Sequence, residues 1–255
     1  MEIIEDHKKY YFIIFIIVFL ITVFIASFSW AYNPDVYLDD DKDGLSNYQE
    51  KAIYQTFWYD ADSDKDGYND GLEVANGYSP KQAKLKMREA DTDNDGLNDA
   101  WEIKLGTNLM LRDTDNDGYL DSTEIYNNYS PTDSQATQIN KRIEVSTTDL
   151  NLKFFINDIL VDTFPVSTGK PTTPTPLGEF KIIAKYPIKH YNNLPNTKWN
   201  MHFATVNGLR YYIHGAYWHD KFGQETVSGG CVNVRYEDME PFYNLTSIGT
   251  PVIIN

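Results

Sequence analysis

The feature that most constrains how this chain can fold is an acidic pattern of twelve residues that occurs four times between residues 39 and 124. Each copy has aspartates at positions 1, 3 and 5, glycine at position 6, Asn or Asp at position 9 and glutamate at position 12. We name the copies loop 1 (39–50), loop 2 (62–73), loop 3 (91–102) and loop 4 (113–124). Alternate carboxylates converge on one point, glycine permits a sharp bend, position 7 offers its carbonyl, and the last glutamate can bind through both oxygens. The pattern therefore predicts four loops that each wrap a calcium ion.

The charge of the segment that holds these loops supports the prediction. Residues 33–136 contain 24 Asp and Glu against 9 Lys and Arg, a balance of −15 that equals the formal charge of the whole chain. Without divalent cations the segment would repel itself, whereas bound calcium would neutralise it and let it become compact. A solvated acidic linker would not need glycine and glutamate at fixed positions, and the negative charge argues against a nucleic-acid partner. The expected calcium ligands are Asp39, Asp41, Asp43, Asn47, Glu50, Asp62, Asp64, Asp66, Asp70, Glu73, Asp91, Asp93, Asp95, Asp99, Glu102, Asp113, Asp115, Asp117, Asp121 and Glu124.

An apolar run at the N-terminus predicts a membrane anchor. Residues 10–32 carry no charge and are dense in Ile, Phe and Val, which is long enough to cross a bilayer. Lys8 and Lys9 precede the run and aspartates follow it, so residues 1–9 are expected in the cytoplasm and everything after residue 32 outside. A signal peptide cleaved after Ser29-Trp30-Ala31 is the alternative, but the apolar core exceeds the usual length of about 7–15 residues. We therefore expect a single-pass protein of the cell membrane, with the rest of the chain extracytoplasmic.

A lone cysteine near the C-terminus is the candidate for chemistry. Cys231 lies in Ser228-Gly229-Gly230-Cys231-Val232-Asn233 and follows Ile213-His214-Gly215 in the chain. One cysteine cannot form an intramolecular disulfide, and a thiol must lose its proton before it attacks a carbonyl. A nearby imidazole can take that proton, and glycines leave backbone N–H groups free to stabilise an oxyanion. A small buried cysteine in a glycine turn remains the alternative on these residues alone.

The last third of the chain predicts a mostly β domain. Residues 127–140, rich in Ser, Thr, Asn and Gln, are expected to be the linker into this domain, for which we set the bounds 137–255. Asn157-Asp158 and Asn207-Gly208 are tight-turn signals between apolar runs, so each predicts a β-hairpin. One helix is expected, over residues 237–245. The expected strands cover residues 143–146, 152–156, 159–166, 180–183, 203–206, 210–213 and 252–254.

Residues 141–255 resemble a YkuD-type L,D-transpeptidase catalytic domain, from the family that cross-links peptidoglycan. The stretches that carry the resemblance are Phe164-Pro165-Val166-Ser167-Thr168-Gly169, Thr173-Pro174-Thr175-Pro176-Leu177-Gly178-Glu179-Phe180, Ile213-His214-Gly215, Ser228-Gly229-Gly230-Cys231-Val232-Asn233 and Gly249-Thr250-Pro251-Val252. Two features depart from the family. Most members have histidine where this chain has Gly229, and the 13 residues between His214 and Ser228 are slightly fewer than usual.

The resemblance implies a mechanism and its residues. Cys231 would attack the carbonyl between the diamino acid and the terminal D-Ala of a donor stem tetrapeptide, while His214, oriented by the carbonyl of Gly215, accepts the thiol proton. Attack by an amine of a second stem on the resulting thioester would give a 3→3 cross-link, and no cofactor is implied for catalysis. The N–H groups of Gly230 and Cys231 would bind the oxyanion. The roles expected of the remaining residues are loop bracing for Ser228 and Asn233, and either a substrate carboxylate contact or a surface ion pair for Arg235.

The four acidic loops resemble thrombospondin type 3 repeats, a family of structural calcium-binding loops. The Asp-Thr-Asp-Asn-Asp-Gly forms and Leu105-Gly106-Thr107-Asn108 carry this resemblance. Loop starts are 23, 29 and 22 residues apart, so we interpret residues 79–90 as an insertion that forms a helical turn or two. The resemblance implies a stalk, residues 33–136, that holds the last domain away from the membrane.

Two other functions remain open from the sequence. Water as the acceptor would make the same site an L,D-carboxypeptidase, and a calcium-dependent surface protein could bind wall peptides without catalysis. A sortase is disfavoured because Gly-Gly precedes Cys231 where a sortase has threonine, and papain-like peptidases place cysteine before histidine. The expected architecture is therefore multidomain: a transmembrane helix, a calcium-loop stalk with short helices, and a mostly β L,D-transpeptidase domain acting on peptidoglycan stem peptides.

Overall fold

The computed structural model describes residues 33–191 and 194–255 of the chain. Within these residues, no helix combines the length and the apolar character that a membrane crossing needs. The predicted anchor, residues 10–32, and the predicted cytoplasmic segment, residues 1–9, lie outside the described residues. The membrane span therefore stays a prediction.

Each acidic loop leads into a short helix that begins at position 9 of the loop. The helices of the repeat segment are η1 (Pro34–Val36), α2 (Asn47–Gln49) with the following π-helical turn η2 (Glu50–Tyr54), α3 (Asp70–Ala75), α4 (Asp99–Leu105) and α5 (Asp121–Asn127). Glycine at position 6 has φ between +99° and +104° in all four loops, a left-handed conformation that L side chains avoid. The four loops therefore share one backbone bend, and the conserved spacing of glycine and glutamate has a direct geometric cause.

The loops are joined in two pairs. In loop 2 the backbone N–H of Gly71 donates to Asp43 Oδ2 of loop 1 at 2.8 Å, and in loop 4 that of Ser122 donates to Asp95 Oδ2 of loop 3 at 3.0 Å. A Cβ at position 71 would lie 2.3 Å from the Asp43 carbonyl oxygen, so only glycine permits this approach in the first pair. Position 10 of the second loop thus always contacts position 5 of the first.

Residues 79–90 are not a helical insertion, which corrects our prediction. Pro80 has no N–H and Lys84 has φ +67°, and the segment forms turns closed by an isolated β-bridge between Tyr78 and Lys86. The same arrangement follows loop 4, where Tyr129 bridges Gln138 and Ala136 has φ +55°. Tyr-Ser-Pro stands at 78–80 and again at 129–131, and loops 1 and 3 start 52 residues apart. The repeating unit is therefore two loops plus a closing turn, and the predicted linker, residues 127–140, contains the second such turn.

The C-terminal part of the chain is built on a single nine-stranded sheet in the order β4-β9-β1-β2-β3-β8-β7-β6-β5. Its strands are β1 (Lys141–Ser146), β2 (Asn151–Ile156), β3 (Ile159–Ser167), β4 (Gly178–Lys181), β5 (Ala184–Tyr191), β6 (Leu194–Val206), β7 (Leu209–Ala216), β8 (Val232–Arg235) and β9 (Pro251–Ile254). Both predicted hairpins are present, and the paired positive φ angles at 157–158 and 207–208 fit the turns that Asn-Asp and Asn-Gly favour. Strands β5 and β8 were not predicted, and the expected strand 180–183 ends at Lys181. The mostly β prediction for this part is confirmed.

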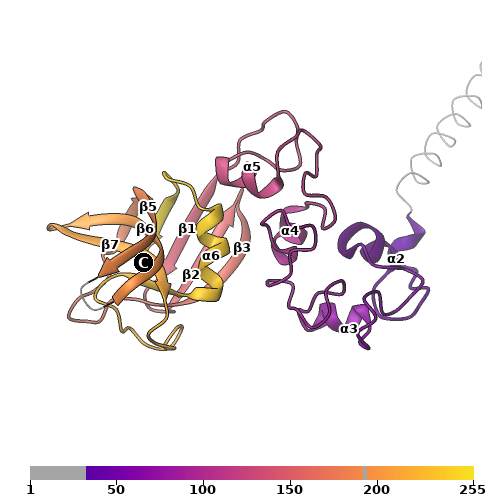
Figure 1. Cartoon of the computed structure of the whole chain (residues 1–255), viewed down its shortest axis with the longest axis horizontal. Helices are drawn as coiled ribbons and strands as arrows, with labels where there is room; N and C mark the ends of the chain where they lie inside the picture. Colours follow the sequence, from indigo (N-terminus) through magenta and orange to yellow (C-terminus); the bar gives the residue numbers. More distant parts are fainter. Residues whose placement is uncertain (1–32, 192–193) are drawn as a thin grey trace, which may run out of the picture.

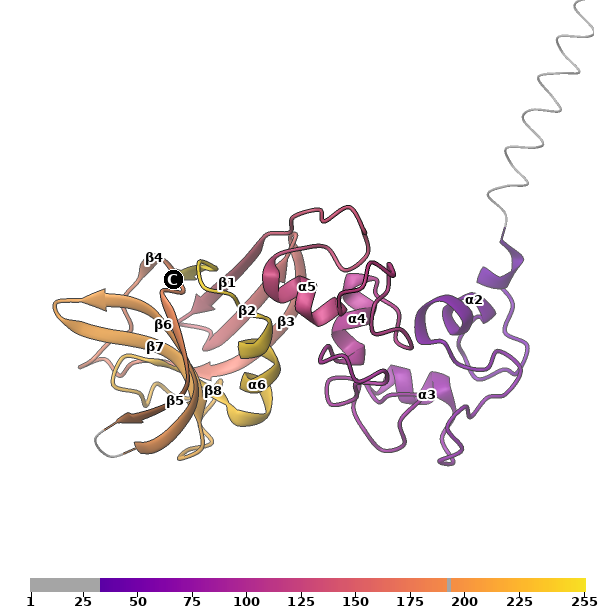
Figure 2. The same ribbon diagram turned by 45° about the horizontal axis from the view of Figure 1, so that its top comes forward.

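Helix α6 (Tyr236–Leu245) lies against the sheet and contacts α5, and Figures 1 and 2 show it beside the strands. Lys141 joins α6 to the repeats, because its buried ammonium donates to the carbonyls of Ile125 and Tyr126 at the end of α5 and of Leu245 at the end of α6. The distances are 2.7, 3.1 and 2.8 Å. A cation at these two helix ends satisfies carbonyls that lack a partner within their helices.

Loops 3 and 4 share the hydrophobic core of the sheet. Trp101 of α4 and Ile125 of α5 are at most 1% exposed and belong to the same buried cluster as Phe154, Phe164 and Phe242. The Trp101 ring lies 6.2 Å from the Phe154 ring and 6.5 Å from the Phe164 ring, between centroids. The second pair of loops is therefore fused to the β domain, and only the first pair extends away from it, as Figure 1 shows.

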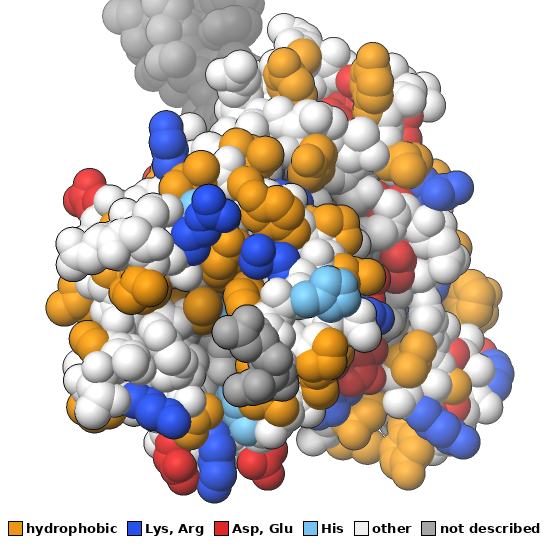
Figure 3. All heavy atoms as spheres, turned by 60° about the vertical axis from the view of Figure 1, so that its left-hand side comes forward, with side chains coloured by type: hydrophobic (Ala, Val, Ile, Leu, Met, Phe, Trp, Pro, Cys, Tyr) orange, Lys and Arg blue, Asp and Glu red, His pale blue; other side chains and the backbone are white. Residues whose placement is uncertain are grey.

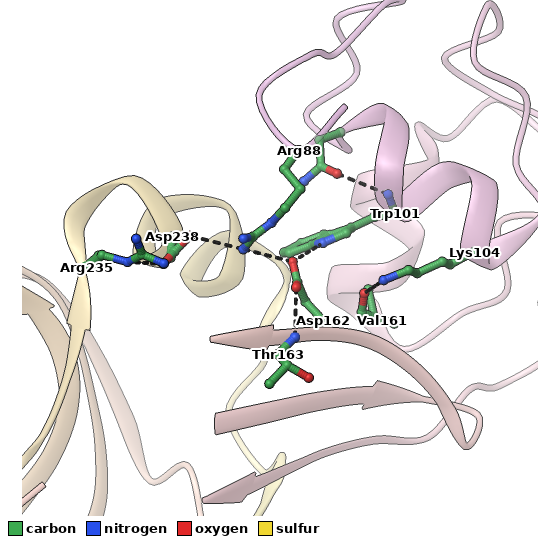
Figure 4. A network of polar contacts seen from close by, with 9 residues as sticks. Arg88, Trp101, Lys104, Val161, Asp162, Thr163, Arg235 and Asp238 are labelled. Atoms are coloured by element: carbon green, nitrogen blue, oxygen red, sulfur yellow. Dashed lines mark hydrogen bonds and ion pairs between the residues drawn. The ribbon is translucent and has the colours of Figure 1, made fainter. Parts of the chain in front are cut away.

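Polar contacts surround this shared core (Figure 4). Trp101 Nε1 donates to Asp162 Oδ2 of β3 at 2.8 Å, and Lys104 Nζ donates to the Val161 carbonyl at 2.6 Å. Arg88, from the turn after loop 2, pairs with Asp162 at 3.1 Å and with Asp238 of α6 at 3.0 Å. The indole and the guanidinium thus tie the repeats to the first half of β3.

Candidate active site

The histidine and the cysteine lie on neighbouring parallel strands. His214 is on β7, and Cys231 immediately precedes β8, which pairs with β7 in the register Ile213 to Val232 and His214 to Asn233. Cys231 therefore stands beside Tyr212, whose backbone N–H approaches the sulfur. A crossover of only 15 residues joins β7 and β8, which are neighbours in the interior of the sheet, so Cys231 lies two register positions before the partner of His214.

His214 is held in one tautomer by its neighbour. The ring is 4% exposed, and its Nδ1 lies 3.0 Å from the carbonyl oxygen of Gly215. A carbonyl only accepts, so Nδ1 carries the hydrogen and Nε2 is left as the basic nitrogen. Burial lowers the pKa of His214 to about 4, so the imidazole is neutral near pH 7. Gly215 is required here because a Cβ would lie 2.6 Å from the Tyr236 ring.

Cys231 is the one thiol of the chain and is held in its neutral form. Burial raises its pKa to about 11, and the N–H of Tyr212 offsets this shift only in part. A neutral thiol beside a neutral imidazole is therefore the resting state at physiological pH. Because neither group is charged beforehand, an attack by the sulfur would require a base such as the neutral His214 imidazole to take the thiol proton.

The loop before Cys231 is braced by Ser228. Ser228 Oγ donates to the Cys231 carbonyl at 2.6 Å and accepts from the Gly230 N–H at 3.0 Å. The Ser228 backbone donates to the Thr168 carbonyl at 3.1 Å, just beyond the end of β3. In this structure the Gly230 N–H is bonded to Ser228 Oγ, so the oxyanion role of the Gly230 and Cys231 N–H groups stays a prediction.

The two glycines before the cysteine differ in what surrounds them. Gly230 has φ +120°, and a Cβ there would lie 2.7 Å from the Tyr211 ring, so this position needs glycine. At Gly229, where the related family has histidine, no atom of the described residues lies within 4 Å of a built Cβ. The space that a larger side chain would occupy is open, so Gly229 is not forced by packing.

Two aromatic residues flank the imidazole. The rings of Tyr191 and Trp218 lie 5.6 Å and 5.8 Å from the His214 ring, and the Tyr191 hydroxyl donates to Asn200 Oδ1 at 3.0 Å. Burial is the main cause that raises the pKa of Tyr191, and the Cys231 group is the second. Tyr191 and Asn200 were not predicted from the sequence, because both lie in a hairpin without any motif.

Asn233 faces His219, and their hydrogen bonds determine the tautomer of the His219 ring and the orientation of the Asn233 amide. Asn233 is 1% exposed, and its amide group lies 3.0 Å from His219 Nε2. The Lys221 N–H donates to His219 Nδ1 at 3.2 Å, so Nε2 must carry the ring hydrogen in the neutral imidazole. With the amide turned so that Asn233 Oδ1 accepts from Nε2, the oxygen that otherwise lacks a partner is satisfied. Asn233 therefore holds the 217–221 segment against β8.

Arg235, the last residue of β8, is engaged in ion pairs. Its guanidinium pairs with Asp238 at 3.0 Å and with Glu237 at 3.6 Å, on the side of β8 that meets the repeats (Figure 4). Of the two roles considered for Arg235, the structure shows the ion pair. Around the sheet end that carries β5 to β7, Figure 3 shows mainly hydrophobic side chains with several basic ones between them, and acidic side chains mostly at the margins.

The acidic loops fit a divalent cation. In each loop the aspartates at positions 1, 3 and 5 bring carboxylate oxygens within 4.8 Å of one another. Within the described part of the chain, one buried oxygen at position 3 and one at position 12 lack a hydrogen-bond partner in all four loops. Burial, and then neighbouring aspartates, raise the pKa of Glu50, Glu73 and Glu124 to about 7 and that of Glu102 to about 9. Unpartnered hard oxygen donors with like charges around them are what Ca²⁺ neutralises.

The residues at position 9 have a bracing role in their own loops. Asn47, Asp70, Asp99 and Asp121 each accept the backbone N–H of position 2 through Oδ1, at 2.8 to 3.1 Å. Asp70 of loop 2 also places an oxygen within 4.8 Å of ligand atoms of Asp43 and Glu50 of loop 1. Position 9 therefore acts on its own loop as a brace and, in loop 2, adds a carboxylate to the cluster of the preceding loop.

Two family models match the chain. Residues 140–254 match the L,D-transpeptidase catalytic domain, YkuD, and residues 39–56, 62–77, 91–108 and 113–128 match the bacterial TSP3 repeat. Both resemblances predicted from the sequence, to the catalytic domain and to thrombospondin type 3 repeats, are confirmed.

Individual proteins match over the same C-terminal region. A Bacillus licheniformis protein that bears the name L,D-transpeptidase YkuD is 31% identical over 113 residues, which are 44% of this chain and 64% of the relative. A Mycobacterium tuberculosis protein named as a probable L,D-transpeptidase 3 is 32% identical, over 35% of this chain and 37% of the relative. The crystal structure of an L,D-transpeptidase from Mycobacterium tuberculosis covers 47% of this chain and 59% of its own, at 28% identity and a TM-score of 0.42. The chain thus spans less than two thirds of the curated relatives it matches.

Proposed function

We propose that this chain, whose residues 140–254 are an L,D-transpeptidase catalytic domain of the YkuD family, is an extracytoplasmic enzyme that cross-links peptidoglycan stem peptides. The observation that carries the proposal is the tautomer of His214. Its Nδ1–H donates to the Gly215 carbonyl, which leaves Nε2 basic on the strand beside Cys231. Base and nucleophile are therefore arranged for acyl transfer through sulfur.

The first half-reaction uses these two groups. Cys231 Sγ attacks the carbonyl between the diamino acid and the terminal D-Ala of a donor stem, and His214 Nε2 takes the thiol proton. As the tetrahedral intermediate collapses, the carbon–nitrogen bond to D-Ala breaks, and the leaving nitrogen takes the proton back from the imidazolium. A thioester on Cys231 and free D-Ala remain.

The second half-reaction regenerates the thiol. The side-chain amine of a neighbouring stem attacks the thioester carbonyl, its proton passes to His214, and the sulfur leaves as the new amide forms. The product is a 3→3 cross-link. Ser228 keeps the loop in place during both halves, since it binds the Cys231 carbonyl and the Gly230 N–H.

The other parts of the chain fit a location outside the cytoplasm. We propose that residues 10–32 anchor the chain in the cell membrane and that the repeats bind calcium through positions 1, 3, 5 and 12. When bound, calcium would supply positive charge that offsets the balance of −15 in residues 33–136. Its role is structural, because the carboxylate clusters that could hold it in the described residues do not include His214 or Cys231.

Mass analysis of the full chain in detergent tests the proposal. Incubated with disaccharide tetrapeptide, the wild type is expected to gain the mass of the disaccharide tripeptide acyl group and to form 3→3 dimers. Cys231→Ala is expected to do neither, with turnover lowered at least about 10³-fold. Tripeptide without dimers would identify an L,D-carboxypeptidase. A wild type that binds wall material but never forms an adduct or a product would overturn the enzyme in favour of a wall-binding protein.

A further inference from the structure

The second loop of each pair has an open groove beside its acidic cluster. The groove at loop 2 has a volume of about 490 Å³ and is lined by Asp66, Tyr68, Glu73, Asn76 and Tyr78, with Lys84 at its edge. The groove at loop 4 has a volume of about 510 Å³ and is lined by Asp117, Tyr119, Glu124, Asn127 and Tyr129, with Ala136 at its edge. Each residue of the first set stands 51 positions before its counterpart in the second, apart from the edge residue. The molecule therefore repeats this groove as part of its two-loop unit.

Loops 1 and 3 differ from loops 2 and 4 at position 7. Leucines occupy position 7 in loops 1 and 3 and are buried, with Leu45 5% exposed and Leu97 0% exposed. In loops 2 and 4 the same position holds Tyr68, 57% exposed, and Tyr119, 62% exposed. In the loops with buried leucines, position 5 is covered by the next loop, through Gly71 and Ser122. Pairing thus closes one loop of each pair and leaves the other accessible.

A buried glutamate that could hold a cation lines each groove. Glu73 and Glu124 line the grooves, are only 5% and 4% exposed, and each has a buried Oε2 without a partner among the residues in the structure. The walls are pairs of tyrosines, of which Tyr78 and Tyr129 are each 37% exposed. A cation site at the floor and aromatic faces at the walls suit a ligand that combines oxygen donors with flat apolar surfaces.

We propose that the grooves of loops 2 and 4 bind the glycan strand of the cell wall, with calcium in the loop and the tyrosines against the sugar rings. The hydroxyl, N-acetyl carbonyl and lactyl carboxylate oxygens of stripped strands are hard ligands of the kind that Ca²⁺ takes, and tyrosine offers an apolar face with a polar tip. The volumes fall in the range of small-ligand sites and admit about one disaccharide each. Two equal grooves in a tandem unit fit a polymer that repeats the same disaccharide. The choice of a wall glycan rests on the proposed function, which acts on peptides attached to that polymer.

Binding of stripped glycan strands to the full chain in detergent tests this proposal. The strands are freed of stem peptides by an amidase, so the cysteine has no substrate, and affinity is measured by calorimetry in calcium and in EGTA. The wild type is expected to bind only in calcium, and Tyr68→Ala combined with Tyr119→Ala to weaken binding at least tenfold. Tyr59→Ala is the matched control, because Tyr59 is 63% exposed and lies between the loops outside both grooves; it is expected to bind as the wild type does.

A second measurement separates loss of the groove from loss of the fold. The number of calcium ions bound by the double variant is expected to equal that of the wild type, since neither tyrosine side chain is a carboxylate ligand. Binding that persists in EGTA, a double variant with unchanged affinity, or a wild type that binds no strand would each overturn the proposal. Turnover of soluble stem tetrapeptide is assayed in parallel. Intact turnover without glycan binding would contradict only the proposal for the grooves. Glycan binding without turnover would contradict only the proposed enzymatic function.

Discussion

The calcium loops and the thiol site both bury ionisable groups, but they become neutral in different ways. In loop 3, Glu102 is surrounded by Asp93, Asp95 and Asp99, and burial with these like charges raises its pKa to about 9. At the thiol site, burial lowers the pKa of His214 to about 4 and raises that of Cys231 to about 11. His214 and Cys231 are neutral through burial, whereas the loop carboxylates become neutral only when they bind a proton or a cation from solution.

Because of this difference, the charge state of the loops depends on the ions in solution, whereas that of the thiol site does not. A neutral thiol and a neutral imidazole can exchange one proton between them, so the site is complete within the protein. Neighbouring carboxylates with unpartnered oxygens carry the same charge, so they cannot neutralise one another. We therefore expect the repeats, and not the catalytic groups, to respond to calcium and to mild changes of pH.

Removal of calcium is the largest expected effect. A ligand that binds only the folded state stabilises it by about 4 kcal/mol per site when its concentration is about 1,000 times Kd, and the chain has four loops of this kind. Chelation with EGTA should therefore lower the melting temperature of the whole chain, because loops 3 and 4 share the core of the sheet. Circular dichroism at 222 nm and calorimetry in calcium and in EGTA measure the change.

The sign of the pH dependence provides the control for that experiment. Without calcium, the raised pKa of Glu50, Glu73 and Glu124, about 7 against 4.5, means that the folded state binds more protons than the unfolded state in this interval. Stability without calcium should therefore rise as the pH falls from 7 to 5. In calcium it should fall, because protons compete with the ion. The same sign in both conditions would show that these carboxylates are not the calcium ligands.

Trp101→Ala should separate the repeats from the β domain. The substitution removes a side chain that is 1% exposed, together with its hydrogen bond to Asp162, and the resulting cavity should cost about 3–5 kcal/mol of unfolding free energy. Urea denaturation measures it. Trp58→Ala is the control, because Trp58 is 37% exposed and is outside the shared core, and it should cost less than about 1 kcal/mol. Equal losses in the two variants would mean that the repeats and the sheet do not depend on this contact.

Alkylation of Cys231 tests the neutral resting state. With a pKa of about 11 instead of 9.0, the thiolate fraction at pH 8 should be about 100-fold lower than that of a free peptide with the same loop sequence. The rate of reaction with iodoacetamide, followed by mass spectrometry from pH 6 to 11, should rise with pH up to about 11. A rate that equals that of the free peptide at pH 8 would instead indicate a thiolate–imidazolium pair.

Gly229→His is expected to have the smallest effect. The space beside Gly229 is open, so the added ring should change the unfolding free energy by less than about 0.5 kcal/mol. Because His214 already supplies the base, the acylation rate should change by less than about tenfold, measured by the mass of the acyl-enzyme over time. A gain above about 100-fold would show that the wild-type site lacks a group it needs.

Features that depend on neighbouring residues were readable in the sequence. Asn157-Asp158 and Asn207-Gly208 predicted their hairpins because turn geometry depends on the residues at the turn itself. The cysteine, the histidine and the loop carboxylates could be identified because their chemistry requires particular residue types at fixed spacing. The repeated Tyr-Ser-Pro at 78–80 and 129–131 was a further local signal, and it would have revealed the two-loop unit.

Non-local contacts account for what was missed. Strand β8 has only four residues, and it forms because β3 and β7 lie on its two sides. Tyr191 reaches His214 only through the pairing of β5 with β6, and the Gly230 N–H is engaged by Ser228 only in the folded loop. No spacing in the chain reports such contacts.

The sequence by itself determined the four acidic loops, the hairpins and the pair His214 and Cys231, because each depends on residue type and short-range geometry. Only the tertiary structure decided that loops 3 and 4 share a core with the sheet, that loops 2 and 4 stay open, and that the thiol and the imidazole are neutral. The physical reason is burial. Whether Trp101, Tyr119 or Cys231 meets water depends on segments far away in the chain, and burial sets both packing energy and pKa.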